Sequence, residues 1–259
     1  MTIAGRGALV TGGGRGIGAA AARRLADRGV RVVVAARSTD QVESVAAELR
    51  EAGTDAWAVT CDVAEPTEVA AMCRAAAERL GAVDILVNNA GVATSAPVAK
   101  LALEEWTRLW TINATGAFLA MQGVLPGMIE RGWGRIVNVA SVAALRGARY
   151  IGGYAASKHA LLGLTRSAAA EVATSGVTVN AVCPGYVDTP MTDTTIANIV
   201  KRTGMEASAA LDAVLATTPQ RRLISPEEVA ASVAFLCDEE ARSINGQTVV
   251  LDGGATGAL

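Results

Sequence analysis

The stretch GALVTGGGRGIG, residues 7–18, gives the clearest indication of the fold of the whole chain. It begins as a short apolar run and continues through glycines at positions 12, 16 and 18 into an alanine-rich segment. A strand that turns through glycines into a helix lets the backbone approach a pyrophosphate group, which the helix N-terminus then stabilises. Glycines also serve ordinary structural turns, but the strand before them and the helix after them favour a dinucleotide site.

The same alternation of strand and helix continues along the chain. Six further apolar strands are predicted, at 31–36, 56–62, 84–91, 134–141, 177–185 and 247–254. Helices are predicted at about 16–28, 40–52, 66–80 and 103–130, and again around Tyr154. Near-continuous apolar strands separated by helices are typical of a parallel sheet that is covered on both faces. The sequence therefore predicts an α/β fold: one doubly wound domain over residues 1–259, with a seven-stranded parallel sheet.

One segment, residues 188–224, is too long for an ordinary connection between a strand and a helix. Its composition predicts one or two helices, which we expect to form a lid over a ligand site.

Composition argues against several classes of protein. The formal net charge is −2 without a basic cluster, so neither nucleic acid nor an anionic membrane is an expected partner. The four cysteines (Cys61, Cys73, Cys183 and Cys237) are scattered and the chain has one histidine, which predicts buried free thiols rather than disulfides or a metal site. We find no secretory signal and no run approaching the roughly 18 apolar residues of a membrane span, and expect a soluble cytoplasmic protein.

The segment YAASKHA, residues 154–160, places Tyr154 and Lys158 one turn apart on a predicted helix. The pair could be simple packing with a lysine that reaches solvent, or Lys158 could lower the pKa of Tyr154 from its usual value of about 10. Ser141 ends a predicted strand 13 residues earlier. Because ligands bind beyond the carboxyl ends of strands in such sheets, this placement favours an acid/base role for Tyr154.

Three motifs occur in a fixed order: TGGGRGIG at 11–18, NNAG at 88–91 and YAASK at 154–158. In this order the chain resembles the short-chain dehydrogenase/reductase family, whose fingerprint is TGxxxGxG, NNAG and YxxxK, over almost its whole length. The resemblance implies a Rossmann fold, a nicotinamide cofactor and oxidation or reduction at CH–OH groups. The segment NAVCPGYVDTPM, residues 180–191, is similar to that of polyketide ketoreductases and other 3-oxoacyl reductases.

By the same resemblance the catalytic residues are Ser141, Tyr154, Lys158 and Asn113. Ser141 would donate to a substrate carbonyl oxygen on which negative charge develops, although a serine at a strand end is often a turn residue. Lys158 would also bind the nicotinamide ribose. Asn113 would belong to a proton relay with water, or it is a polar residue tolerated within a helix. His159, the one histidine, is expected to be a packing or interface residue, because no GxSxG motif accompanies it.

NADP(H) is the favoured cofactor. NAD enzymes usually place an acidic residue after the second strand, where this chain has Ala36 followed by Arg37. Arg37 and Arg15 could hold a 2′-phosphate by charge-assisted hydrogen bonds, or both are solvated surface arginines. Asp62 resembles the residue that contacts adenine, and it could instead cap the next helix. The positions that match the cofactor site of the family are Gly12, Arg15, Gly16, Ile17, Gly18, Arg37, Asp62, Val63, Asn89, Ala90, Gly91, Tyr154, Lys158, Pro184, Gly185, Val187 and Thr189.

The favoured activity is NADPH-dependent reduction of a ketone, such as a 3-oxoacyl ester or thioester. Oxidation of a sugar, steroid or alicyclic alcohol is the alternative, and a non-catalytic dinucleotide sensor is a remote one. Arg146 and Arg149 could hold an acidic or thioester-linked substrate, or they are rim charges. Carrier-protein docking is doubtful, because Gly132 and Ser175 stand where fatty-acid reductases of the family have arginines, although the adjacent Arg131 could partly substitute.

A homo-oligomer, either a dimer or a tetramer, is expected as well. The helix around Tyr154 is apolar nearly all round, so a partner subunit would cover the side that the sheet does not.

Overall fold

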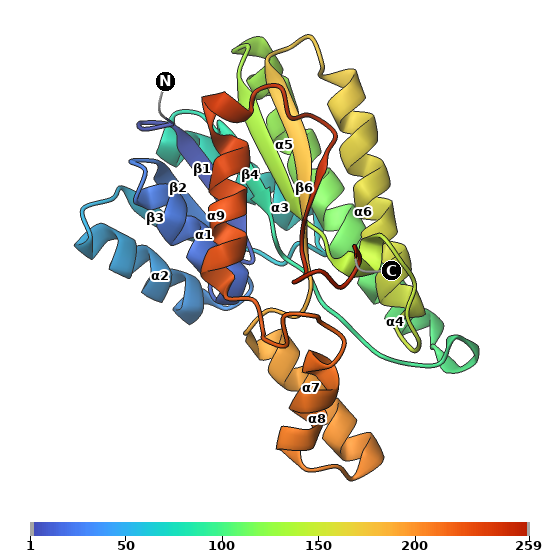
Figure 1. The fold of residues 1–259 in the computed structure, drawn as a ribbon. Coiled ribbons are helices and arrows are strands. Elements are labelled where there is room, and N and C mark those ends of the chain that lie inside the picture. Colours follow the sequence, from blue (N-terminus) through green and yellow to red (C-terminus); the bar gives the residue numbers. More distant parts are fainter. Residues whose placement is uncertain (1–2, 258–259) are drawn as a thin grey trace.

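A computed structural model describes residues 3–257 of the chain. Seven parallel strands form one sheet in the order β3-β2-β1-β4-β5-β6-β7 (Figure 1). This confirms the predicted doubly wound α/β fold. The strands are β1 (Gly7–Thr11), β2 (Arg31–Ala36), β3 (Ala56–Thr60), β4 (Ile85–Asn88), β5 (Gly134–Val139), β6 (Val177–Pro184) and β7 (Thr248–Leu251).

The order of the strands creates the place where a ligand can bind. From β1 the chain moves outward through β2 to β3, and then returns to place β4 on the other side of β1. Connections from the carboxyl ends of β1 and β4 therefore leave in opposite directions. A crevice at this reversal is the usual ligand site of an open α/β sheet.

Helices cover both faces of the sheet (Figure 1). One face carries α1 (Gly16–Ala26), α2 (Thr39–Glu51) and α9 (Pro226–Cys237). The other carries α3 (Pro66–Leu80), α5 (Gly116–Glu130) and α6 (Gly152–Glu171). Successive side chains of a strand point to opposite faces, so in β1 Ala8 and Val10 join the first core and Leu9 joins the second.

The predicted helix at 103–130 is interrupted. It consists of α4 (Leu103–Trp110), a π-helical turn at Thr111–Thr115 and α5, and the buried Asn113 lies within the turn. By length and composition alone Leu103–Glu130 could cross a membrane, which corrects the statement that no such run exists. Of the residues in its most apolar stretch, 44% are buried within the protein, and α5 packs on the sheet and on α3.

The segment 188–224 contains two helices, α7 (Pro190–Thr203) and α8 (Ala207–Leu215). They pack against each other and project beyond the carboxyl ends of the strands (Figure 1). The guanidinium of Arg202, on α7, donates to the side-chain and backbone oxygens of Ser95. The role of this pair of helices as a lid stays a prediction.

Residues 226–237, for which no element was predicted, form the helix α9. Ser225 caps this helix: its hydroxyl oxygen accepts from the backbone N–H of Glu228, whose carboxylate accepts from the N–H of Ser225. The buried face of α9 packs on α1, which follows the glycine loop.

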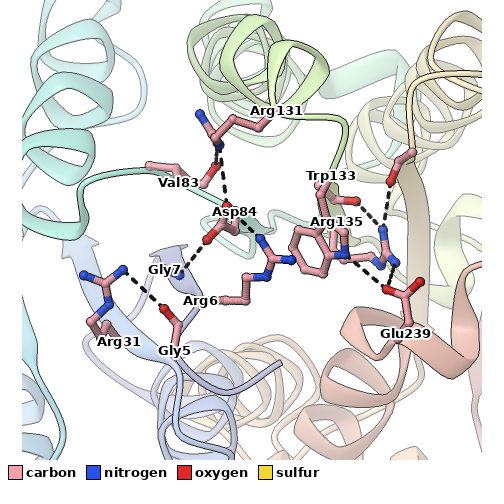
Figure 2. Close-up of polar contacts among 12 residues, drawn as sticks. Gly5, Arg6, Gly7, Arg31, Val83, Asp84, Arg131, Trp133, Arg135 and Glu239 are labelled. Carbon is pink, nitrogen blue, oxygen red and sulfur yellow. Dashed lines mark hydrogen bonds and ion pairs between the residues drawn. The ribbon is translucent and has the colours of Figure 1, made fainter. Parts of the chain in front are cut away.

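Polar side chains also gather at the edge of the sheet where the strands begin (Figure 2). The buried carboxylate of Asp84 accepts from the backbone N–H of Gly7 at 3.1 Å. The guanidinium groups of Arg6 and Arg131 each lie 3.7 Å from Asp84 Oδ1. This carboxylate therefore ties the starts of β1 and β4 together and is neutralised by two cations.

A second part of this cluster surrounds Arg135, which is fully buried at the start of β5 (Figure 2). Its guanidinium donates to Glu239 Oε2 at 3.0 Å, and the same oxygen accepts from the indole N–H of Trp133 at 3.1 Å. Arg135 and Arg6 lie 4.4 and 3.9 Å from the centre of the Trp133 ring. Burial lowers the pKa of Arg135, and Glu239 counteracts this effect.

Candidate active site

The NNAG motif is locked to the glycine loop at the reversal between β1 and β4. The side-chain amide of Asn89 donates to the backbone oxygens of Thr11 at 3.1 Å and Gly12 at 3.0 Å. The hydroxyl oxygen of Thr11 accepts from the backbone N–H groups of Asn89 at 3.1 Å and Ala90 at 3.2 Å. These bonds fix the two loops relative to each other before any ligand binds. The sequence analysis assigned no role to Thr11.

The glycine loop can be built only with glycine at its key positions. Gly12 and Gly16 have φ values of +63° and +54°, in the left-handed region that other residues seldom adopt. A Cβ on Gly18 would lie 2.2 Å from the backbone oxygen of Gly12. No side chain caps α1 at Arg15, so the N–H groups of its first turn are available to an anion. The loop therefore fits the pyrophosphate of a dinucleotide, and Ile17 supports it from the adjoining core.

The end of β2 presents Arg37 to solvent, close to the loop after β3. Its guanidinium lies 3.9 Å from the carboxylate of Asp62, and both groups are partly exposed, so this ion pair contributes little to stability. Asp62 also accepts from the backbone N–H of Ala64 at 2.9 Å, which forms a turn in the loop before α3. The capping role considered for Asp62 is wrong, because the N-cap position of α3 is Glu65. Its contact with adenine, and that of the neighbouring Val63, stay predictions. Arg15 is exposed.

Ser141 lies directly beyond β5, and its hydroxyl group keeps a hydrogen that it can donate. Its oxygen accepts from the backbone N–H of Ala143 at 3.1 Å, so the hydroxyl hydrogen can be donated elsewhere. Tyr154 is partly buried in the first turn of α6. Burial raises the pKa of Tyr154, whereas an interaction with the Ser141 side chain lowers it.

Lys158 is buried, with 4% of its surface exposed, and its ammonium group donates to the backbone oxygen of Val139 at 2.9 Å. Burial lowers its pKa to about 8. In the protein without a cofactor, burial has the larger effect on the pKa of Tyr154 and raises it. The lowering expected from Lys158 together with a bound nicotinamide stays a prediction. A Cβ on Gly91 would lie 3.4 Å from the Lys158 ammonium and 3.2 Å from Asn113 Oδ1, so NNAG reaches both groups.

Asn113 connects the loop after β4 to α6. Its oxygen accepts from the N–H of Val92 at 2.8 Å, and its amide donates to the backbone oxygen of Val92 and to the Ser157 hydroxyl, each at 2.9 Å. Ser157 in turn donates to the backbone oxygen of Tyr154 at 2.8 Å. Both amide hydrogens of Asn113 are thus used within the protein, and its part in a proton relay stays a prediction. No pattern in the sequence predicted the hydrogen bond between Asn113 and Ser157.

The residues that follow β6 return toward the glycine loop. Pro184 ends the strand, and the N–H of Gly185 donates to the backbone oxygen of Leu251 at 2.8 Å. Val187 is buried and forms a β-bridge with Ile224.

Thr189 precedes α7, and a Cβ added to Gly16 would lie 3.1 Å from its methyl group. The structure thus brings Thr189 to the glycine loop, as a contact to a bound dinucleotide requires.

The two arginines considered for the substrate have partners within the protein. Arg146 donates to the backbone oxygen of Ala255 at 3.0 Å, and Arg149 donates to the Tyr150 hydroxyl at 3.2 Å. His159 is exposed and its ring contacts the backbone oxygen of Ala155. Among residues 3–257 no group of three or more histidine, cysteine or acidic side chains could hold a metal ion, and all four cysteines are buried free thiols.

Comparison with known proteins gives matches over nearly the whole chain. The model of the family described as short chain dehydrogenase matches residues 6–199. The 3-oxoacyl acyl-carrier-protein reductase FabG of Vibrio cholerae is 39% identical over 254 residues, which are 98% of each chain. The D-beta-hydroxybutyrate dehydrogenase of Rhizobium meliloti is 37% identical, over 96% of this chain and 98% of the relative.

A solved structure of a variant of actinorhodin polyketide ketoreductase with NADPH superimposes with a TM-score of 0.93. It is 42% identical and covers 96% of this chain and 97% of its own.

Proposed function

Because the chain belongs to the short-chain dehydrogenase family, whose members are nicotinamide-dependent oxidoreductases, we propose that it is an NADPH-dependent ketoreductase of 3-oxoacyl esters or thioesters. The observation that carries the proposal is the approach of the Lys158 ammonium group to NNAG, which is itself locked to the glycine loop. Tyr154 lies one turn before Lys158 on α6 and interacts with Ser141. The ketone reductase activity with a nicotinamide cofactor agrees with the ketoreductase and FabG relatives.

The cofactor would lie across the reversal between β1 and β4. The glycine loop and the first turn of α1 would bind its pyrophosphate, and the loops after β2 and β3 would hold the adenosine half. NNAG, Tyr154, Lys158 and the segment 184–189 would hold the nicotinamide half.

When bound, the reduced nicotinamide supplies the hydride that converts the carbonyl carbon to an alcohol carbon. Ser141 donates its free hydroxyl hydrogen to the carbonyl oxygen, on which negative charge develops during the transfer. Tyr154 then donates its phenolic proton to that oxygen and completes the hydroxyl group. Its raised pKa keeps the phenol protonated at neutral pH, which suits the reductive direction. Lys158 holds positive charge below a pH of about 8 and stabilises the phenolate that remains.

Preference for NADPH follows from the groups at the end of β2. Arg37 is a cation where NAD enzymes usually carry a carboxylate, and Arg15 lies at the start of α1. Arginine binds phosphate through two parallel charge-assisted hydrogen bonds. The partly exposed carboxylate of Asp62 beside Arg37 would have to move away from Arg37 when the phosphate binds, which costs little because the present ion pair is weak.

The first experiment follows oxidation of NADPH and of NADH in parallel with acetoacetyl-CoA as substrate. Fast turnover that prefers NADPH is the expected result. If NADPH binds but no acetoacetyl-CoA is reduced, the 3-oxoacyl assignment is wrong, and free ketones and alicyclic alcohols become the substrates to examine. Equal turnover with NADH would contradict the role given to Arg37.

A cytoplasmic homo-oligomer is part of the proposal. Large apolar side chains are exposed on α4 and α5, with exposed fractions of 72% for Leu103, 38% for Trp106 and 43% for Phe118. The outward side of α6 adds Ala160 and Leu164, which are only partly covered. A second copy would bury these surfaces, and light scattering at micromolar concentration tests this: a strictly monomeric species contradicts it.

A further inference from the structure

A line of buried polar side chains crosses from β4 to α6, away from the groups assigned to the reaction. Asn88 and Asn138 face each other across β4 and β5, and the Asn88 amide donates to Asn138 Oδ1 at 2.9 Å. The Asn138 amide donates to the hydroxyl of Thr165 at 2.9 Å, which itself donates to the backbone oxygen of Leu161 at 2.7 Å. The exposed fractions of Asn88, Asn138 and Thr165 are 4%, 0% and 1%.

This line of side chains connects α6 to β5, the strand whose Val139 also accepts a hydrogen bond from Lys158. Thr165 follows Lys158 by seven residues, or about two turns, so both side chains lie on the same side of α6. Lys158 donates to the backbone oxygen of Val139, the residue next to Asn138. β5 therefore holds α6 at two neighbouring points. At one of these points the contact is made by Lys158, which also has a proposed role at the ligand. At the other point it is made by Thr165, which has no such role.

The other end of the line reaches the glycine loop. Asn88 precedes Asn89, whose amide holds the backbone oxygen of Gly12. The arrangement leaves Asn88 Oδ1 without a hydrogen-bond partner among residues 3–257, a penalty that apolar packing would avoid. The hydroxyl group of Thr165 is satisfied as both acceptor and donor, and satisfied buried hydrogen bonds fix the geometry of the elements that they join.

We propose that Asn138 and Thr165 are positioning residues, which set the height and rotation of α6 on the sheet. They keep Tyr154 and Lys158 in register with Ser141 and the glycine loop. This inference rests on the proposed roles of Tyr154 and Lys158. It assigns no contact with substrate or cofactor to Asn138 or Thr165.

The test compares two substitutions of Thr165. Thr165→Val keeps the volume and removes the hydroxyl group, and its kcat is expected to fall about tenfold, since small misplacements of reacting groups are costly. Its Kd for NADPH should change less than about threefold, because the pyrophosphate contacts are untouched. Thr165→Ser keeps the hydroxyl group and should recover most of the lost kcat. Thr165→Ala serves if Thr165→Val does not fold.

Thr178 provides a matched control. It is a buried threonine of β6 whose hydroxyl has no hydrogen-bond partner among residues 3–257. Thr178→Val makes the same chemical change without breaking a bond, so it should keep the wild-type kcat. An equal loss of kcat in Thr178→Val, or no recovery in Thr165→Ser, overturns the proposal. Unchanged kcat in a folded Thr165→Val protein also overturns it.

Hydrogen exchange of the ligand-free proteins gives a readout that needs no substrate. Thr165→Val should speed the exchange of backbone amides in α6 relative to those of α5, whereas Thr178→Val should not. If the wild-type protein reduces no 3-oxoacyl substrate, the proposed function fails, and exchange alone then decides the positioning role. In that case faster exchange confined to α6 supports the role, and unchanged exchange excludes it.

Discussion

Polar side chains gather at both ends of the parallel sheet, and the two ends use them differently. Where the strands begin, Asp84 and Glu239 each face arginine side chains, and the aromatic ring of Trp133 lies between two of these (Figure 2). Where the strands end, Ser141 retains a hydroxyl hydrogen to donate, and α1 begins without a side-chain cap. Ion pairs between arginine and acidic side chains hold the sheet together at the first end, whereas the hydroxyl group of Ser141 and the first turn of α1 leave donors for a ligand at the other end.

Replacing Tyr154 gives the largest expected effect at the functional end. Tyr154→Phe removes the proton that completes the alcohol, so kcat should fall by about 10²–10⁴-fold while NADPH still binds. Steady-state kinetics and a fluorescence titration with NADPH measure the two quantities. Tyr150→Phe, an exposed neighbour on the loop before α6, should stay within about twofold of the wild type. Normal turnover of Tyr154→Phe would remove the basis of the proposed mechanism.

A substitution at the opposite end should affect stability and leave turnover intact. Glu239→Gln leaves the buried Arg135 cation without its counter-charge, which should lower the free energy of unfolding by about 2–3 kcal/mol. Denaturant unfolding measures the loss, and kcat per folded molecule should not change. Glu240→Gln alters an exposed neighbour and should have little effect on either quantity. A fall in kcat for Glu239→Gln would show that the two ends are not independent.

Two arginines at opposite ends of β2 allow the two ends of the sheet to be compared along one strand. Arg37 follows its carboxyl end, and loss of a charged hydrogen bond in Arg37→Ala should raise the KM for NADPH about 10- to 100-fold, with little change for NADH. Arg31 lies at its beginning and donates to the backbone oxygen of Gly5. Arg31→Ala should leave both KM values unchanged. If Arg31→Ala raised the KM for NADPH and Arg37→Ala did not, the 2′-phosphate would bind at the other end of β2.

The smallest expected effect concerns the carboxylate of Glu228, which accepts hydrogen bonds at the end of the sheet where the strands end. Hydrogen bonds from Arg222 and from the N–H of Ser225 lower the pKa of Glu228 to about 2. A lowered carboxyl pKa stabilises the folded state above the ordinary value of about 4.3, and this stabilisation is lost as the pH falls toward 2. Melting temperatures of wild type and Glu228→Gln should therefore differ slightly at pH 7 and converge at pH 2. A gap that persists at pH 2 would mean that charge is not its cause.

The strands and the site loops were predictable because their signals are local. Apolar runs of β-branched residues gave all seven strands, and glycines flanked by a strand and a helix gave the turn at residues 11–18. The missed helix α9 also carries a local signal, since Ser225 and Glu228 have the spacing of a capping box.

Other features depend on partners far away in the sequence, which no pattern reveals. The bond between Asn138 and Thr165 spans 27 residues, and that between Arg146 and Ala255 spans 109. The π-helical turn at Thr111–Thr115 has the apolar spacing of an ordinary helix, so the register shift that brings Asn113 to Val92 was not visible. The direction of the Tyr154 pKa depends on how deeply the phenol is buried, which the sequence does not report.

The contact between α9 and α1 bears on the order in which the protein matures during synthesis. The glycine loop leaves the ribosome long before residues 226–237, and until these residues follow, the side of α1 that packs on α9 stays uncovered. A nascent chain shorter than this exposes buried alanines of α1 to aggregation and to chaperones. Because a ligand stabilises only the state that binds it, a nicotinamide cofactor can favour this packing step only after α9 has been made. We therefore expect the cofactor to bind after the synthesis of α9, although the glycine loop is made well before it.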